Sequence, residues 1–230
     1  MPTDFETAFA NARKQGLKDF NYKGKPYTTQ YREEKAFSDV LNQYPALGNV
    51  YNAKNTVVSI ANQNRLNQLK AVGGVGRQLE HWFPDNEGEP GLPHPTPGKY
   101  NFEFYNPNLS KNSATMSSAI FLDALHGMKA DTGYKALRDK FNQNWTPEEL
   151  SWIKQKYSKE ANKGETLDKY VDRTELDAYL RGAMNPMSDD ELKSGDYPDE
   201  YAQNFRAGRG YSKTQRQIVE QMKTYLKTKK

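Results

Sequence analysis

The stretch from Gly76 to Met128 constrains the fold most, because it places a long proline- and glycine-rich segment between apolar runs. It holds six of the twelve prolines and all three histidines. The spacing of proline and glycine over Pro84 to Gly98 predicts an irregular loop. On either side of it, the run Gln78 to Phe83 and the alternating aromatic run Tyr100 to Tyr105 predict a short central pair of strands.

A helix is predicted directly after these strands. Ser110 or Asn112 supplies its cap, and Gly127 or Gly133 marks its end. Apolar residues recur along it at the spacing of one buried helical face. These residues are Met116, Ile120, Phe121, Ala124, Leu125 and Met128.

This helix carries an incomplete metal-binding pattern at Leu122 to His126. Small zinc peptidases place His-Glu-x-x-His on one helix, as two ligands and a general base. Here the first position is a leucine, which binds no metal, and no histidine follows His126. Two interpretations stay open: Asp123 and His126 form the polar flank of a helix, or they form a degenerate zinc site with His81 or His94. We predict no catalytic residue, no metal and no cofactor, with these four as the only metal candidates.

The composition is poor in apolar residues. Hydrophobic residues make up 35% of the 230, mean hydropathy is -1.01, and the aromatics include 15 Tyr and 10 Phe. We therefore expect an elongated molecule with several small cores rather than one large core. The absence of cysteine excludes disulfides and thiolate chemistry. The net charge of +4 does not by itself indicate nucleic-acid binding.

The sequence contains no apolar run of membrane-spanning length and no apolar signal-peptide region at its start. These features predict a protein made in a cytoplasm, without an integral membrane segment.

The first thirty residues predict a helix followed by a β-hairpin. Asp4 to Gln15 has a helical apolar stripe, and Lys23-Gly24 marks a tight turn between two short strands. An isolated hairpin is marginally stable, so its aromatic residues must pack against a helix or a partner. We predict that this segment docks on a partner through Phe5, Phe9, Phe20, Tyr22 and Tyr27. The alternative is that it folds back onto a helix predicted at Thr56 to Ala71 and completes the core.

A family resemblance rests on the same segment. Phe5 to Gln30 joins Ala-Arg-Lys-x-Gly at the end of an alanine-rich helix to Phe-x-x-x-Gly-Lys-x-Tyr-Thr-Thr. This pattern resembles a segment of internal, ejected and wall-degrading virion proteins of tailed, podophage-like bacteriophages. The loop Trp-x-Pro-Asp-x-x-Gly-x-Pro-Gly-x-Pro after His81 and the segment Leu176 to Gly182 also resemble phage proteins of unassigned role. The resemblance implies the virion as location and other virion proteins as oligomeric partners, and it implies no catalytic residues.

The remaining segments predict a mainly α fold with a small β component, an α+β class. We expect strands only within Phe20 to Thr29 and Leu79 to Tyr105. Helices are expected at Arg32 to Tyr44, Thr56 to Ala71, Tyr134 to Asn142, after the Thr146 cap, at Leu167 to Met184 and at Ser212 to Thr228. Three regions follow: a docking segment (1–30), a central α+β region (31–130) and a helical C-terminal region with a basic tail (131–230).

Charge is polarised near the end of the chain. Acidic residues dominate Pro186 to Glu200, and basic residues dominate Phe205 to Lys230. The tail is either a solvated basic face or a contact to the DNA backbone. The candidates for that contact are Arg206, Arg209, Lys213 and Arg216.

No phosphate-binding loop, nucleophile elbow or Cys-His pair is present. The sequence therefore favours a non-enzymatic virion component that acts through protein contacts during assembly or genome delivery. The alternative is a phage hydrolase, either a degenerate zinc peptidase or a peptidoglycan-degrading enzyme. Glu80 and Glu103 are the carboxylates considered for the second activity.

Overall fold

The computed structural model describes residues 3–72, 79–85, 88–89, 92–105, 113–172, 176–184, 186, 189, 203–204 and 207–228. The chain folds as a mainly helical α+β protein, as predicted. Among the described helices, none is both long and apolar enough to cross a membrane.

The elements follow in chain order. The first half contains α1 (Asp4–Lys14), β1 (Asp19–Tyr22), β2 (Lys25–Thr28), α2 (Arg32–Gln43), the 3-10 helix η1 (Pro45–Asn49), β3 (Thr56–Ile60), α3 (Gln63–Ala71), β4 (Leu79–Trp82), β5 (Gly88–Glu89), β6 (Leu92–Pro93) and β7 (Tyr100–Phe104). The second half contains α4 (Ser113–Gly127), the 3-10 helix η3 (Met128–Ala130), α5 (Thr132–Asn142), α6 (Pro147–Glu160), α7 (Leu167–Tyr170), α8 (Leu176–Met184) and α11 (Lys213–Lys227).

The central sheet has three strands in the order β3-β7-β4. The expected pair β4 and β7 is antiparallel, and β3 adds to β7 in parallel. The prediction of one helix over Thr56 to Ala71 was wrong, and so was the confinement of strands to two segments. Thr56 to Ile60 is β-branched except for Ser59, and it pairs with β7 as a strand. Helix α3 begins after this strand, where the Asn62 side chain caps it by accepting from the Arg65 N–H. The loop Pro84 to Gly98 is also less irregular than expected, because β5 and β6 pair within it.

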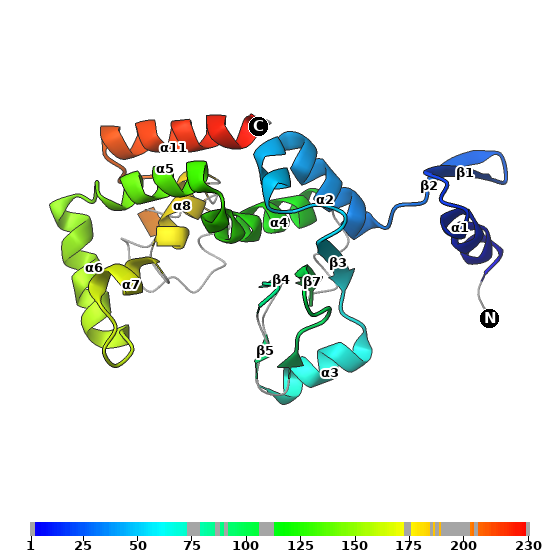
Figure 1. The fold of residues 1–230 in the computed structure, drawn as a ribbon, viewed down its shortest axis with the longest axis horizontal. Helices are drawn as coiled ribbons and strands as arrows, with labels where there is room; N and C mark the ends of the chain where they lie inside the picture. The colour runs from blue at the N-terminus through cyan, green and yellow to red at the C-terminus, as the bar shows by residue number, and fades with distance from the viewer. Residues whose placement is uncertain are drawn as a thin grey trace.

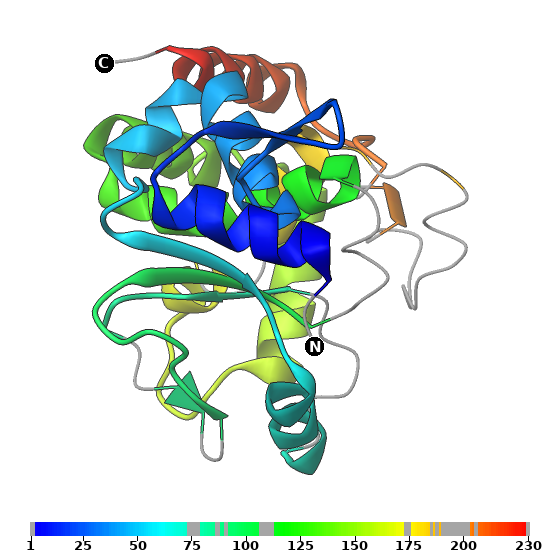
Figure 2. The same cartoon turned by 90° about the vertical axis from the view of Figure 1, so that its right-hand side faces the viewer.

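Strand β7 is covered on both faces. On one face Phe102 and Phe104, both fully buried, point toward α2 and α4, and the Phe102 ring lies 5.8 Å from that of Phe37. On the other face Glu103 and Tyr105 point toward α3, where Tyr105 packs with Trp82. Figures 1 and 2 show the resulting layers: α2 and α4 above the sheet and α3 below it.

The described apolar residues form one main core, so the expectation of several small cores was wrong. This core joins α2, η1, β7 and α4 to the C-terminal helices through large side chains. Its fully buried members include Tyr51, Phe102, Met128, Tyr134, Phe141 and Tyr170. A much smaller second cluster, Leu69, Trp82 and Tyr105, lies between α3 and the sheet. Tyrosine and phenylalanine side chains thus fill much of the core of a chain that is poor in apolar residues.

The predicted C-terminal helices are confirmed at α5, α6 and α11. Thr146 and Ser212 cap α6 and α11, each in a reciprocal capping box with the residue three positions later. Those two later residues also meet, since the Gln215 amide donates to both oxygens of the fully buried Glu149 carboxylate, at 2.9 and 2.8 Å. For the helix expected over Leu167 to Met184, the structure describes α7 and α8, and residues 173–175 lie outside the described part. The cap expected at Ser110 or Asn112 also lies outside it, whereas the end of α4 at Gly127 is confirmed.

Asp131 connects three elements that are distant in the sequence, η1, α5 and α11. Its carboxylate accepts from the Tyr134 N–H at 2.9 Å as the cap of α5, from the Tyr225 hydroxyl at 2.5 Å and from the Asn49 amide at 3.1 Å. Burial alone would raise the pKa of Asp131, but these hydrogen bonds lower it below its ordinary value. A lowered folded-state pKa means that the stabilisation is complete above the unfolded pKa and is lost as the pH falls through the folded pKa.

We predict that Asp131→Asn lowers the free energy of unfolding by about 0.5–2 kcal/mol at pH 7, because asparagine keeps the cap but loses the charge-assisted bond to Tyr225. The difference from the wild type should shrink below pH 4. Urea titrations at pH 7 and pH 3.5 measure both values. Asp139→Asn, which changes an exposed carboxylate paired with Lys135, is the matched control and should cost less than about 0.5 kcal/mol. If Asp131→Asn lowered the free energy of unfolding equally at both pH values, the ionised Asp131 carboxylate would not be the source of the stabilisation.

Gly127 is predicted to tolerate no side chain. A Cβ built there would lie 1.7 Å from the hydroxyl of Tyr51, which is fully buried and donates to the Ala124 carbonyl at 3.0 Å. Gly127→Ala should therefore destabilise the protein by about 1–3 kcal/mol through overpacking. Gly48→Ala is the control, because a Cβ at Gly48 meets nothing within 4 Å. Equal melting temperatures of the two variants would refute the close approach.

Candidate partner-binding site

The N-terminal module, defined here as residues 3–31, is a small structure in its own right. Thr3 and Glu6 form a capping box that starts α1, and Gly16, with φ of +71°, lets the chain leave the helix. The hairpin turns through Lys23 and Gly24, both at positive φ, as the sequence predicted.

Six aromatic rings hold the module together. The Phe5 ring is central, with centroids of four other rings within 6.3 Å, and Phe20 lies opposite Tyr27 in the hairpin register. The set comprises Phe5, Phe9, Phe20, Tyr22, Tyr27 and Tyr31. None of them is fully buried, and Tyr27 and Tyr31 are 36% and 48% exposed. All five residues predicted to bind a partner therefore belong to one partly exposed aromatic cluster.

The module stands beside the body of the protein rather than on α3. Figure 1 shows α1, β1 and β2 at one end, joined to α2 by the segment after β2, with α3 in a different part of the molecule. The alternative prediction, in which this segment packs on one helix over residues 56–71, was wrong: that helix is not formed, and the module lies across a groove from Thr56, Val57 and Val58.

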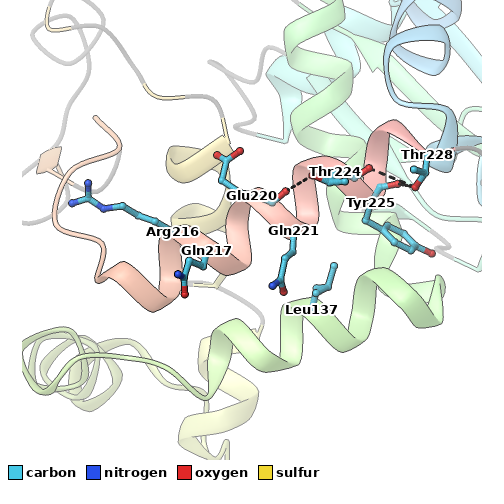
Figure 3. A pocket seen from close by; sticks show the side chains of 8 residues that line it. All are labelled: Leu137, Arg216, Gln217, Glu220, Gln221, Thr224, Tyr225 and Thr228. Carbon is cyan, nitrogen blue, oxygen red and sulfur yellow. Dashed lines mark hydrogen bonds between the residues drawn. The ribbon is translucent and has the colours of Figure 1, made fainter.

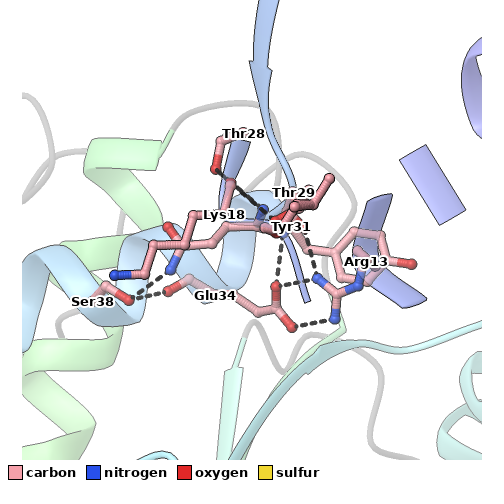
Figure 4. Close-up of polar contacts among 9 residues, drawn as sticks. Arg13, Lys18, Thr28, Thr29, Tyr31, Glu34 and Ser38 are labelled. Atoms are coloured by element: carbon pink, nitrogen blue, oxygen red, sulfur yellow. Dashed lines mark hydrogen bonds and ion pairs between the residues drawn. The ribbon is translucent and has the colours of Figure 1, made fainter. Parts of the chain in front are cut away.

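Arg13 anchors the module to α2. Its guanidinium donates to both oxygens of Glu34, at 2.7 and 3.0 Å, and to the Thr29 carbonyl at 2.8 Å, and its Cζ lies 4.3 Å from the centre of the Tyr31 ring. Glu34 also accepts from the Tyr31 N–H at the start of α2. Figure 4 shows these contacts converging at the junction. Burial opposes the charge of Glu34, but the bonds from Arg13 and Tyr31 outweigh it and lower the pKa of Glu34.

The four metal candidates are divided between the two faces of the sheet. His81 lies on the core face, its ring parallel to that of Phe102 with centroids 4.4 Å apart, and His126 reaches the same region against Phe83 at 5.5 Å. His94 lies against Trp82, with its Nε2 2.8 Å from the Phe83 carbonyl and its Nδ1 accepting from the Thr96 N–H. Asp123 is half-buried on α4 with His126. Within the described part of the chain, no three His, Asp or Glu side chains are placed to share a metal ion.

A buried ion pair that the sequence analysis did not single out lies below the sheet. The Arg65 Nε donates to both oxygens of Glu103, at 3.0 and 3.1 Å, and the Tyr105 hydroxyl donates to Glu103 at 2.8 Å. The Arg65 and Glu103 side chains are 11% and 5% exposed. Burial and the Glu103 charge raise the pKa of Tyr105. The signal in the sequence was a glutamate inside the most aromatic strand, which needs a partner if the strand is covered on both faces.

Glu80 lies opposite Glu103 in the register of β4 and β7. The two carboxylates considered for a glycosidase are thus neighbours on one face, and Glu103 is held by Arg65 and Tyr105 in a buried network.

The basic tail is only partly described. Lys213 and Arg216 are exposed on the first turns of α11, Arg209 pairs with Asp189 at 2.9 Å, and Arg206 lies outside the described residues. Figure 3 shows the groove between α5 and α11, whose lining is mixed, with Arg216 and Glu220 among glutamine, threonine and tyrosine side chains. The lining of this groove therefore carries one charge of each sign.

Comparison with protein-family models, curated proteins and solved structures finds no match for this chain.

We predict that Arg65→Met destabilises the protein by about 3–5 kcal/mol, because it leaves the Glu103 carboxylate buried without its cation. Adding Glu103→Gln should recover part of this loss, since the neutral amide can still accept from Tyr105. Denaturant unfolding of the single and double variants measures both effects. Lys35→Met, which breaks the exposed pair with Asp39, is the control and should cost less than about 1 kcal/mol. A cost of Arg65→Met no larger than that of the control would show that the pair is not structural.

Proposed function

We propose that the chain is a structural or accessory component of a tailed-bacteriophage virion and acts through protein contacts during assembly or genome delivery. One correspondence carries the proposal. The residues that resemble phage virion proteins, Phe5 to Gln30, coincide with the N-terminal module, whose aromatic cluster is separate from the main core.

The N-terminal module is the docking element in this proposal. Its rings bury one another only in part, and exposed aromatic residues are favoured as anchors in protein interfaces. The Arg13–Glu34 pair orients the module on α2 without incorporating it into the core. The body of the protein can therefore stay folded while the module contacts a neighbour.

Mass spectrometry of purified particles is the direct test of location. The proposal expects the chain in stoichiometric amounts after removal of loosely bound proteins. Its absence from particles, or clearing of peptidoglycan by the purified chain in a zymogram, would replace the proposal with another function.

Deletion of residues 1–30 tests the docking element. We predict that the remainder melts within a few degrees of the full chain, because few contacts with the core are lost, and that incorporation into particles is abolished. Tyr27→Ala should lower incorporation severalfold with little change in melting. The control is Val72→Ala, at a similarly exposed apolar residue on the end of α3. Normal incorporation of the deleted chain, or unfolding of the remainder, would contradict the assignment.

A further inference from the structure

Strand β3 forms one edge of the central sheet, and no strand among the described residues pairs with its outer side. The Tyr100 N–H donates to the Asn55 carbonyl and the Ala61 N–H to the Phe104 carbonyl, both at 2.8 Å, so the odd-numbered residues of this segment face β7. In a parallel ladder the intervening residues then direct their backbone groups outward. The outward N–H groups of Val58 and Ile60 have no hydrogen-bond partner among the described residues. The Thr56 N–H is already used by the Asn52 carbonyl, at 2.9 Å.

This edge lacks the features that usually protect an edge strand. Thr56 to Ile60 reads Thr-Val-Val-Ser-Ile, with no charge and no proline, and Ile60 is 39% exposed. Natural sheets normally place lysine, proline or a bulge at such a position, because an open edge recruits another strand. The sequence of β3 therefore favours pairing of this edge.

A groove of about 540 Å³ lies beside the same edge. One wall comes from the N-terminal module, the floor from α2, and the other wall from β3 and from Ala53 in the turn before it. The lining residues are Arg13, Gly16, Leu17, Thr29 and Gln30; Glu34, Phe37, Ser38 and Leu41; and Ala53, Thr56, Val57 and Val58. Leu17 is 46% exposed, and the two charged residues of the groove, Arg13 and Glu34, neutralise each other.

We propose that the edge of β3 and this groove bind one extended peptide segment of a partner protein as an added strand. Only a backbone in β conformation presents acceptors and donors at the spacing of the free groups on Val58 and Ile60. The groove selects a segment whose central residues are uncharged, with apolar side chains directed at Leu17 and Leu41. The N-terminal module walls the far side, so the space beside β3 takes a single strand and excludes the edge of a second copy's whole sheet.

Nuclear magnetic resonance of the full-length, ¹⁵N-labelled chain tests this proposal with a defined probe, the acetylated and amidated peptide Lys-Thr-Val-Thr-Val-Thr-Lys. At saturation, amide exchange at Val58 and Ile60 should slow at least about tenfold, because their N–H groups become bonded. Shift changes should be confined to β3, Leu17 and the neighbouring part of α2. The same peptide with proline at its central position should produce neither effect.

Two variants separate this site from other surfaces. Val58→Pro removes an outward N–H without breaking a bond to β7, and Leu17→Lys places a charge in the groove at an exposed position, where folding is unaffected. Each should weaken peptide binding at least about tenfold, whereas Val72→Lys, also at an exposed apolar residue, should not. If Val58→Pro does not fold, Leu17→Lys alone decides.

Unprotected amides at Val58 and Ile60, or full binding by Leu17→Lys, would overturn the proposal. So would concentration-dependent dimerisation that protects the same amides without peptide, because the edge would then pair with a second copy. The experiment does not use particles, so its outcome is independent of the virion assignment.

Discussion

The cover on both faces of β7 is the constraint on which the rest of the fold depends. Asn101, Phe102, Glu103 and Phe104 are all 4% exposed or less, so each face of this strand must meet another layer. Its aromatic face packs on α2 and α4 and starts the main core that reaches the C-terminal helices. Its other face buries a glutamate, which is stable only because Arg65 on α3 and Tyr105 bind it. The central sheet thus fixes helices on two sides.

The N-terminal module lies outside this arrangement. Its rings pack on one another, and its polar connection to the body centres on Arg13 and Glu34, whose side chains are both 34% exposed. A pair with that exposure contributes about 0.2–1 kcal/mol, since solvent screens it. The main core therefore does not require the module. This division of the chain places a partly exposed aromatic cluster, a groove and an open strand edge next to one another.

Local signals predicted much of the fold. Thr146-Pro147 and Ser212 mark helix starts because capping depends on neighbours in the sequence, and Lys23-Gly24 marks the hairpin turn for the same reason. The five aromatic residues of the docking segment were also recognisable, because the helix and hairpin that bring them together are adjacent in the sequence.

Long-range pairing was not predictable in the same way. Val57 and Ile60, and again Leu66 and Leu69, are three residues apart, as neighbours on a helix would be, so the segment resembled one helix. Parallel pairing with β7 makes its first part a strand. Nothing near Thr56 in the sequence indicates that partner, which follows about forty residues later. The same limitation hid Arg65 as the cation for Glu103, the link between Glu149 and Gln215, and the groove beside β3.

Native-state hydrogen exchange of the full chain, measured across a series of low urea concentrations, distinguishes the opening of the β7-centred core from that of the N-terminal module. We expect the slowest exchange at the amides of Phe102 and Phe104, with a free energy of opening equal to that of global unfolding. Amides of α1, β1 and β2 should exchange through a separate opening with a lower free energy and a weaker urea dependence. Exchange of both groups through one common opening, with the same free energy, would contradict the division into a β7-centred core and an independent N-terminal module.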